Sequence, residues 1–520
     1  MATHIEIGAS PEGVQKVSLK RANRHGLIAG ATGTGKTVTL QVLAEAFARE
    51  GVNVFAADIK GDFSGCASFD TTPPEWASAR AAEINLPLTP EAQGVTFWDV
   101  YGELGHPVRT TVTEMGPVLM GRVLEATDAQ EGALTIAFRL ADDWIKEGKN
   151  EGLLLDLNDL RALLTYLSEN AEDIGKQYGL VTPQSIAALQ RKVLQLEMDG
   201  ADRFFGEPAF KLEELMRPRT DGKGTIHVLA SERLVQSPRL YSAFLLWLMS
   251  ELWEELPEVG DQDKPKLVFF FDEAHLLFRD APKDLINKVE QVVRLIRSKG
   301  VGIYFVTQSP TDIPEIVLSQ LGNRFQHALR AYTPTDQKAV RAAAQSFRAN
   351  ANVDVAKEIQ ELGVGEALVS TLDDKGAPTP VARTKIRPPN SHVGPILLTE
   401  RQTIMRANTA ARVYETAVDR ESAHEILSRR ATIAAEAEAR EEEREAREKE
   451  DARAARTART TGARTTGTRS GGAAPRTRTT RSSSRTTAVE RQTGRVATGF
   501  FNTIAREIMR GILGTPRRRR

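Results

Sequence analysis

Short apolar runs alternate with amphipathic stretches along most of the chain, a pattern typical of a parallel sheet whose strands are joined by helices. Residues 25–29 form one apolar run, residues 38–50 carry apolar side chains at helical spacing, and residues 52–57 form a second apolar run. Gly51 stands where such a helix ends. This order of strand, helix and strand predicts a parallel sheet with a right-handed crossover.

The pattern changes after about Ser68, where stretches with helical spacing begin. They cover residues 115–124, 133–145, 153–167 and 183–197. Thr182 and Pro183 form a good helix start, with threonine as N-cap and proline in the first turn. We therefore expect an α/β core that contains a mainly helical insertion at residues 68–220.

The core pattern resumes after the insertion, so the two halves of the core are expected at residues 1–67 and 221–395. The first 19 residues are interpreted as a short β-rich preamble. Further strands are predicted at residues 225–230, 267–271, 302–307, 325–331 and 366–370, and helices at 238–255 and 281–299.

The C-terminal part is far more polar. We predict a charged helix within residues 396–454, running from 409 to 451, and favour a solvated single helix over a coiled coil. Residues 455–490 are rich in Arg, Thr and Ser and are expected to be a disordered linker. Residues 491–520 regain helical spacing and are expected to form an amphipathic helix with a basic end.

The 520 residues carry no apolar run of the roughly 18 residues that a membrane span needs. The first ten residues lack the basic and apolar regions of a signal peptide. The single cysteine, Cys66, fits a reducing compartment, and packing is the preferred interpretation over reactivity. We expect a cytoplasmic protein.

The formal net charge of zero conceals an asymmetry. Residues 452–520 hold seventeen arginines, no lysine and two acids, a net charge of +15, so residues 1–451 carry −15. The chain is therefore an acidic body with a basic tail.

The strongest chemical signal follows the first apolar run, where residues 30–37 match the P-loop pattern G-x-x-x-x-G-K-[ST] in full. Glycines let successive backbone N–H groups point at phosphate oxygens, and the following helix adds the positive end of its dipole. Lys36 is predicted to reach the β- and γ-phosphates, and Thr37 to bind Mg²⁺. The residues predicted to bind ATP are Gly30, Ala31, Thr32, Gly33, Thr34, Gly35, Lys36, Thr37 and Val38.

A second signal is the apolar run at 267–271 followed by Asp272 and Glu273, the arrangement of a Walker B strand. Asp272 is predicted to hold Mg²⁺ through its water shell, and Glu273 to act as the general base toward the attacking water. Alone, this acidic pair would suggest a helix N-cap, but together with the P-loop it favours catalysis. His275 completes an Asp-Glu-Ala-His sequence and is interpreted as a packing or supporting residue.

Polar residues after the neighbouring strands are further candidates. Gln308 follows the predicted strand 302–307 and is predicted to sense the γ-phosphate or the attacking water. Asp58, Lys60 and Asp62 follow the strand at 52–57. Contact of Asp58 or Asp62 with the metal shell and simple capping of a turn are equally good interpretations.

Many P-loop motors complete their site with an arginine from a neighbouring subunit. Surface ion pairing is the more ordinary role for each candidate taken separately. We favour Arg324 for the catalytic role, from the candidates Arg294, Arg297, Arg324 and Arg330.

Several stretches together resemble the HerA-like bacterial ATPases of the HerA/FtsK class, specifically a branch known as a domain of unknown function. The resemblance covers roughly residues 1–389 and 505–514. It is carried by the P-loop and by the stretches RANRHG at 21–26, ADIKGD at 57–62, FFDEAH at 270–275, RLIRSKGVGIYFVTQ at 294–308 and LGNR at 321–324.

This resemblance implies a RecA-like P-loop NTPase core, a homo-oligomeric ring that is usually a hexamer, glutamate-activated ATP hydrolysis, an arginine supplied by a neighbour, and translocation of DNA. The acidic body and the amphipathic C-terminal helix leave two alternatives open. One is an ATPase that remodels a protein partner bound by the C-terminal helix. The other is a peripheral membrane ATPase, in which the same helix lies on a lipid surface, although docking of that helix on the core or on a ring neighbour is the preferred interpretation.

Overall fold

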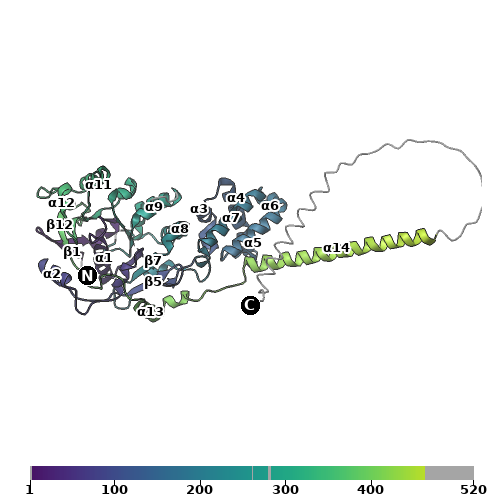
Figure 1. Cartoon of the computed structure of the whole chain (residues 1–520), viewed down its shortest axis with the longest axis horizontal. Coiled ribbons are helices and arrows are strands. Elements are labelled where there is room, and N and C mark those ends of the chain that lie inside the picture. Colours follow the sequence, from purple (N-terminus) through teal and green to yellow (C-terminus); the bar gives the residue numbers. More distant parts are fainter. Residues whose placement is uncertain (1–2, 261, 279–282, 463–520) are drawn as a thin grey trace, which may run out of the picture. The chain divides into compact units, whose positions relative to one another are not determined.

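A computed structural model describes residues 3–260, 262–278 and 283–462 (Figure 1). The chain divides into two compact units, residues 1–438 and 439–520. The predicted amphipathic helix at 491–520 and nearly all of the predicted linker at 455–490 lie outside the described residues.

A mixed sheet forms the centre of the first unit, and twelve strands of the described residues belong to it. Eight neighbouring strands, from β10 to β6, are parallel, and β11, β12, β1 and β2 continue the sheet in antiparallel pairing. In sheet order the strands are β2 (Gly13–Ser18), β1 (His4–Ser10), β12 (Ala382–Ile386), β11 (Glu366–Ser370), β10 (Asn323–Gln326), β3 (Gly26–Ala29), β9 (Val301–Thr307), β8 (Leu267–Phe271), β4 (Asn53–Asp58), β7 (Ile226–Ala230), β5 (Val95–Asp99) and β6 (His106–Pro107).

The central parallel strands β3, β9 and β8 are almost wholly apolar because helices cover both faces of the sheet. Phe270 of β8 packs on one face with Tyr304 of β9 and with Phe47 of α1 (Lys36–Arg49). Phe269 points to the opposite face and meets Phe55 of β4, with 5.0 Å between ring centres. The helices α8 (Pro238–Glu254) and α9 (Lys283–Leu295) contribute to that second face. The sheet thus forms the middle of a three-layer α/β fold.

The helical segment begins later than predicted. Residues 95–107 provide β5 and β6, which extend the main sheet because β5 pairs with β7. The helical part then groups at one end of the first unit (Figure 1). It consists of α3 (Val112–Val123), α4 (Asp128–Lys146), α5 (Leu157–Glu169), α6 (Ala171–Tyr178) and α7 (Pro183–Met198).

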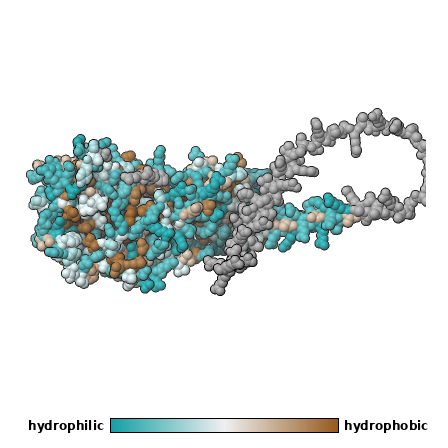
Figure 2. All heavy atoms as spheres, viewed as in Figure 1, coloured by the Kyte–Doolittle hydropathy of each residue, from teal (hydrophilic) through white to brown (hydrophobic). Residues whose placement is uncertain are grey.

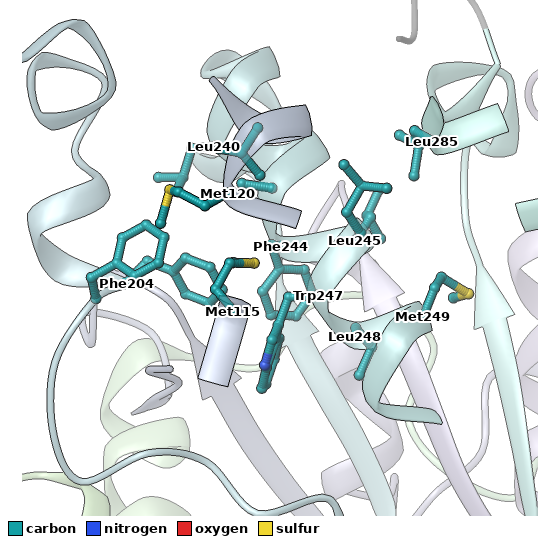
Figure 3. Close-up of a cluster of buried hydrophobic side chains, with 14 of the residues drawn as sticks. Met115, Met120, Phe204, Leu240, Phe244, Leu245, Trp247, Leu248, Met249 and Leu285 are labelled. Atoms are coloured by element: carbon teal, nitrogen blue, oxygen red, sulfur yellow. The ribbon is translucent and has the colours of Figure 1, made fainter. Parts of the chain in front are cut away.

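Helix α8 joins this segment to the sheet. Figure 3 shows Met115 of α3 in one cluster with Phe244 and Trp247 of α8 and with Phe204. The rings of Phe204 and Trp247 lie 5.6 Å apart between centres and meet edge to face. The strongly apolar character of α8 is therefore explained by burial on two sides.

Several shorter helices complete the first unit. Helix α1 is bonded to the segment after β12 through Glu45, whose carboxylate accepts the backbone N–H groups of Asn390 and Ser391 at 2.8 and 3.0 Å. The side-chain hydroxyl of Ser391 also donates to Glu45. The remaining helices are α2 (Glu75–Glu83), α10 (Glu315–Leu318), α11 (Pro334–Gln345), α12 (Val355–Glu361) and α13 (Leu398–Ala407).

The long charged helix differs from its predicted bounds. Helix α14 spans Ala423–Gly462 instead of beginning at residue 409. The chain turns before it because Asn408 caps α13 and donates to the Thr96 hydroxyl at 2.9 Å. Every residue from 428 to 455 is exposed, and Figure 2 shows this helix as mostly hydrophilic, with scattered pale-brown patches.

Cys66 is fully buried, and burial raises the pKa of its thiol well above the ordinary value, which agrees with a packing role.

Among the described residues, every helix is too short or too polar to cross a bilayer.

Replacing Phe269 by alanine is expected to lower the free energy of unfolding by about 3–5 kcal/mol, because loss of the fully buried ring leaves a cavity beside Phe55 on that face of the sheet. Phe69→Ala serves as the matched control, since that ring is 45% exposed and its loss should change stability by less than about 0.5 kcal/mol. Urea unfolding of both variants measures the difference, and equal stabilities would contradict this packing.

Candidate nucleotide-binding and catalytic site

The P-loop connects the end of β3 to the first residue of α1. The backbone N–H of Gly30 donates to Thr307 at 3.2 Å, and that of Ala31 to Ala328 at 2.8 Å, so the end of β9 and the segment just after β10 hold the loop. Gly30 has a positive φ of 153°, and a Cβ there would lie 2.5 Å from the Cβ of His327. Glycine is therefore required at this position by both backbone conformation and space.

The lysine of the motif is turned into the loop. The Lys36 ammonium donates to the carbonyls of Gly30 and Ala31 at 2.7 and 3.0 Å, and the residue is buried. Burial lowers the pKa of Lys36, while the nearby charges of Glu273 and Asp272 act in the opposite direction. The Lys36 amine and the two carboxylates thus lie close enough for their charges to interact.

The strand order brings the separate motifs to one edge of the sheet. Strand β9 lies between β3 and β8, so the P-loop strand and the strand before Asp272 are separated by a single strand. Because all three are parallel, their carboxyl ends open on the same side. Gln308 follows β9 and therefore stands between the P-loop and the acidic pair.

Asp272 is almost completely buried at the end of β8. Burial raises its pKa to about 6, although the charge of Lys60 opposes this change. One carboxylate oxygen accepts the backbone N–H of Glu273 at 2.9 Å. This bond fixes the turn that redirects the chain at Glu273.

Glu273 has left-handed backbone angles, with φ 45° and ψ 47°. Its Oε1 accepts a hydrogen bond from the Lys60 ammonium, and Gln308 donates to its Oε2 at 3.4 Å. His275 Nδ1 lies 3.2 Å from the same Oε2 but without hydrogen-bond geometry. Burial would raise the pKa of Glu273, but the hydrogen bond and charge of Lys60, together with Gln308 and His275, outweigh it and the pKa is lowered.

The turn after β4 is built around Asp58. Its Oδ1 accepts the backbone N–H groups of Lys60 and Gly61, at 3.3 and 2.8 Å, and its Oδ2 accepts that of Phe63 at 3.1 Å. Burial, and then the charges of Glu232 and Asp272, raise the pKa of Asp58 to about 7. Of the two interpretations of Asp58, the structure shows the turn cap.

Lys60 is the member of this site whose role the sequence did not indicate. Burial would lower its pKa, but the carboxylates of Glu273 and Asp272 outweigh that effect and raise it. The available signal in the sequence was a lysine just after a buried strand. The sequence did not indicate its partner, because Glu273 is 213 residues away and becomes a neighbour only through the pairing of β4 with β8.

The candidate arginines are arranged differently from one another. The Arg324 guanidinium donates to three carbonyls of its own chain, those of Leu318, Leu321 and Ser346, at 3.0–3.1 Å. Burial lowers its pKa. Arg294, Arg297 and Arg330 are exposed. These bonds explain Arg324 as a structural residue, so its action on a neighbouring subunit stays a prediction.

The oxygen donors near the P-loop suit magnesium. Thr37 is half-buried at the start of α1, and the Asp272 carboxylate lies at the same edge of the sheet. The described part of the chain holds no group of three His, Cys, Asp or Glu side chains able to bind a metal ion by themselves. Mg²⁺ is commonly held by one or two protein oxygens together with phosphates and waters, so this donor set fits it.

Comparison with known proteins identifies the family. A family model described as Helicase HerA-like C-terminal matches residues 5–520. The chain belongs to the HerA-like family. The DNA double-strand break repair helicase HerA of Sulfolobus acidocaldarius is 22% identical over 359 residues, which is 68% of this chain and 63% of that protein. This HerA-like chain therefore spans less than two thirds of that relative.

Two solved structures align with this chain at low identity. VirB4 of Thermoanaerobacter pseudethanolicus aligns with a TM-score of 0.48 at 16% identity, covering 74% of this HerA-like chain and 96% of VirB4. Plasmid coupling protein TrwB in complex with ADP and Mg²⁺ aligns with a TM-score of 0.44 at 18% identity, covering 75% of this chain and 92% of TrwB.

Two glycines of the HerA-like P-loop provide a matched test of its geometry. Gly30→Ala should disrupt the loop, because the new Cβ would collide with His327. Gly33 also has a positive φ, but a Cβ there meets nothing within 4 Å, so Gly33→Ala should cost only about 1–2 kcal/mol of backbone strain. Thermal unfolding should show a larger loss for Gly30→Ala, and equal losses would contradict the close contact.

Proposed function

We propose that this chain is an ATP-hydrolysing motor that binds ATP with Mg²⁺ at residues 30–38. The observation that supports this most is the meeting of three features at one sheet edge: the P-loop after β3, Gln308 after β9 and Asp272–Glu273 after β8. This reaction needs hydrogen-bond donors that hold the phosphates, a carboxylate that binds the metal ion, and a base.

Each side chain has a distinct role in this proposal. The backbone N–H groups from Thr32 to Val38 bind phosphate oxygens, since those of Gly30 and Ala31 are bonded to Thr307 and Ala328. Lys36 exchanges its two carbonyl partners for the β- and γ-phosphates. Thr37, and Asp272 through the water shell of the ion, would hold Mg²⁺, which would neutralise charge on the phosphates. Gln308 senses the γ-phosphate.

Glu273 is the general base of the proposed reaction. Its carboxylate accepts a proton from water while the water oxygen bonds to the γ-phosphorus. The bond from that phosphorus to the bridging oxygen breaks, which leaves ADP and inorganic phosphate. The low pKa of Glu273 keeps it ionised and ready to accept that proton.

The proposed work is movement of DNA by a cytoplasmic ring, with a hexamer as the favoured size. The name of the Sulfolobus relative, a DNA repair helicase, supports DNA as the substrate. The +15 charge of residues 452–520 provides cations for phosphate contacts. In this ring Arg324 would act on a neighbouring site only after leaving its three carbonyl partners.

Lys36→Ala should weaken ATP binding by about 10- to 100-fold, because a charged hydrogen bond to phosphate is lost. Glu273→Gln should bind ATP normally but lower kcat by about 100- to 10,000-fold. Glu103→Gln is the control, since that carboxylate is exposed and pairs with Arg233. Nucleotide titration and phosphate release separate these effects, and near-normal turnover by Glu273→Gln would show that the base is another residue.

Duplex DNA should stimulate ATP hydrolysis by the full chain. The stimulation should fall steeply as salt rises from about 50 to about 200 mM, because phosphate contacts release counterions. Phosphate release is measured without nucleic acid and with duplex DNA, single strands or RNA, with Lys36→Ala as background. No response to any nucleic acid would exclude the DNA motor and favour the protein-remodelling ATPase that the acidic body suggests.

A further inference from the structure

Lys60 reaches the Glu273 carboxylate from the neighbouring strand. Strands β4 and β8 are parallel neighbours with Ala57 opposite Phe271, so both chains leave the sheet at the same level. The Lys60 ammonium donates to Glu273 Oε1. The lysine side chain is 40% exposed and the glutamate side chain 7%, so the cation extends from the solvent side onto a buried carboxylate.

The backbone under Lys60 is held in place. Asp58, itself buried, accepts the N–H groups of Lys60, Gly61 and Phe63. Gly61 has a φ of 80°, and a Cβ there would lie 2.7 Å from a carboxylate oxygen of Glu232. The lysine side chain therefore starts from a turn with little freedom to move.

The other contacts of Glu273 are weaker. The Gln308 amide stands at the long distance of 3.4 Å, and His275 has no hydrogen-bond geometry toward the carboxylate. The Lys36 ammonium is bonded to P-loop carbonyls. Among the residues that the structure describes, Lys60 makes the one charge-assisted hydrogen bond to Glu273, and such bonds are the strong ones.

The geometry points to Lys60 as a positioning residue that fixes the Glu273 carboxylate in the orientation from which it takes a proton from the attacking water. This role rests on the proposed ATP hydrolysis. Glu273 needs such a partner because its side chain is flexible. The left-handed backbone conformation at this residue does not by itself set the direction of the carboxylate. Misplacing a base by about 1 Å is enough to cost about 100-fold in rate.

The test compares Lys60→Met, which removes the charge, with Lys60→Arg, which keeps it. Lys60→Met should lower kcat for ATP by about 10- to 100-fold, the usual effect of losing a residue that orients a reacting group, with KM unchanged. Lys60→Arg should retain most of the activity. Lys16→Met is the matched control, because that lysine is 47% exposed and pairs only loosely with Glu6 at 3.6 Å.

A double variant provides the second measurement. If Lys60 acts through Glu273, adding Lys60→Met to Glu273→Gln should lower kcat no further. Titration with a fluorescent ATP analogue shows whether each variant still folds and binds nucleotide. Should Lys60→Met fail to bind, Lys60→Gln, which keeps a hydrogen-bond donor without the charge, takes its place in every comparison.

Four outcomes would overturn the inference. The first is an unchanged kcat in Lys60→Met, and the second is a raised kcat in that variant, which would show that the ion pair restrains the base. The third is a loss of kcat in Lys60→Arg equal to that in Lys60→Met. The fourth is a further loss of kcat when Lys60→Met is added to Glu273→Gln. Failure of the proposed function is distinguishable, because then the unaltered chain would not hydrolyse ATP, or Glu273→Gln would hydrolyse it at the normal rate.

Discussion

Burial of the parallel strands on both faces is the constraint from which the rest of the structure follows. Strands β3, β9, β8 and β4 lie between two layers of helices and have no room for unpaired polar side chains. Charged and amide side chains therefore occur only at the first or last residues of these strands and just beyond them. Since parallel strands end on the same side, each polar residue just beyond a strand is brought to one edge, and the P-loop, Gln308 and the acidic pair become neighbours.

This edge combines groups with opposite requirements. Asp272 and Asp58 are buried among apolar strands, and burial raises the pKa of each. Glu273 lies beside them, yet its pKa is lowered because Lys60 supplies a direct positive partner. Neighbouring carboxylates with pKa values pushed in different directions are typical of sites where acids and bases do separate work.

Local patterns predicted the elements well and their arrangement less well. The strands at 267–271 and 366–370 have the predicted bounds, because each is a compact apolar run. Strand β5 was taken for part of the helical insertion, because its place in the sheet depends on pairing with β7, more than a hundred residues away. The bond from Lys60 to Glu273 was missed for the same reason: strand order is a long-range property that a local pattern does not contain.

Helix α1 has two attachments, at its N-terminus to the P-loop and near its C-terminal end, through Glu45, to the backbone at Asn390 and Ser391. An α-helix is stiff along its axis, and α1 is held at both ends. A small shift of the P-loop along this axis would therefore also move the chain just before α13. Mechanical strain generated at one attachment has a direct route to the other.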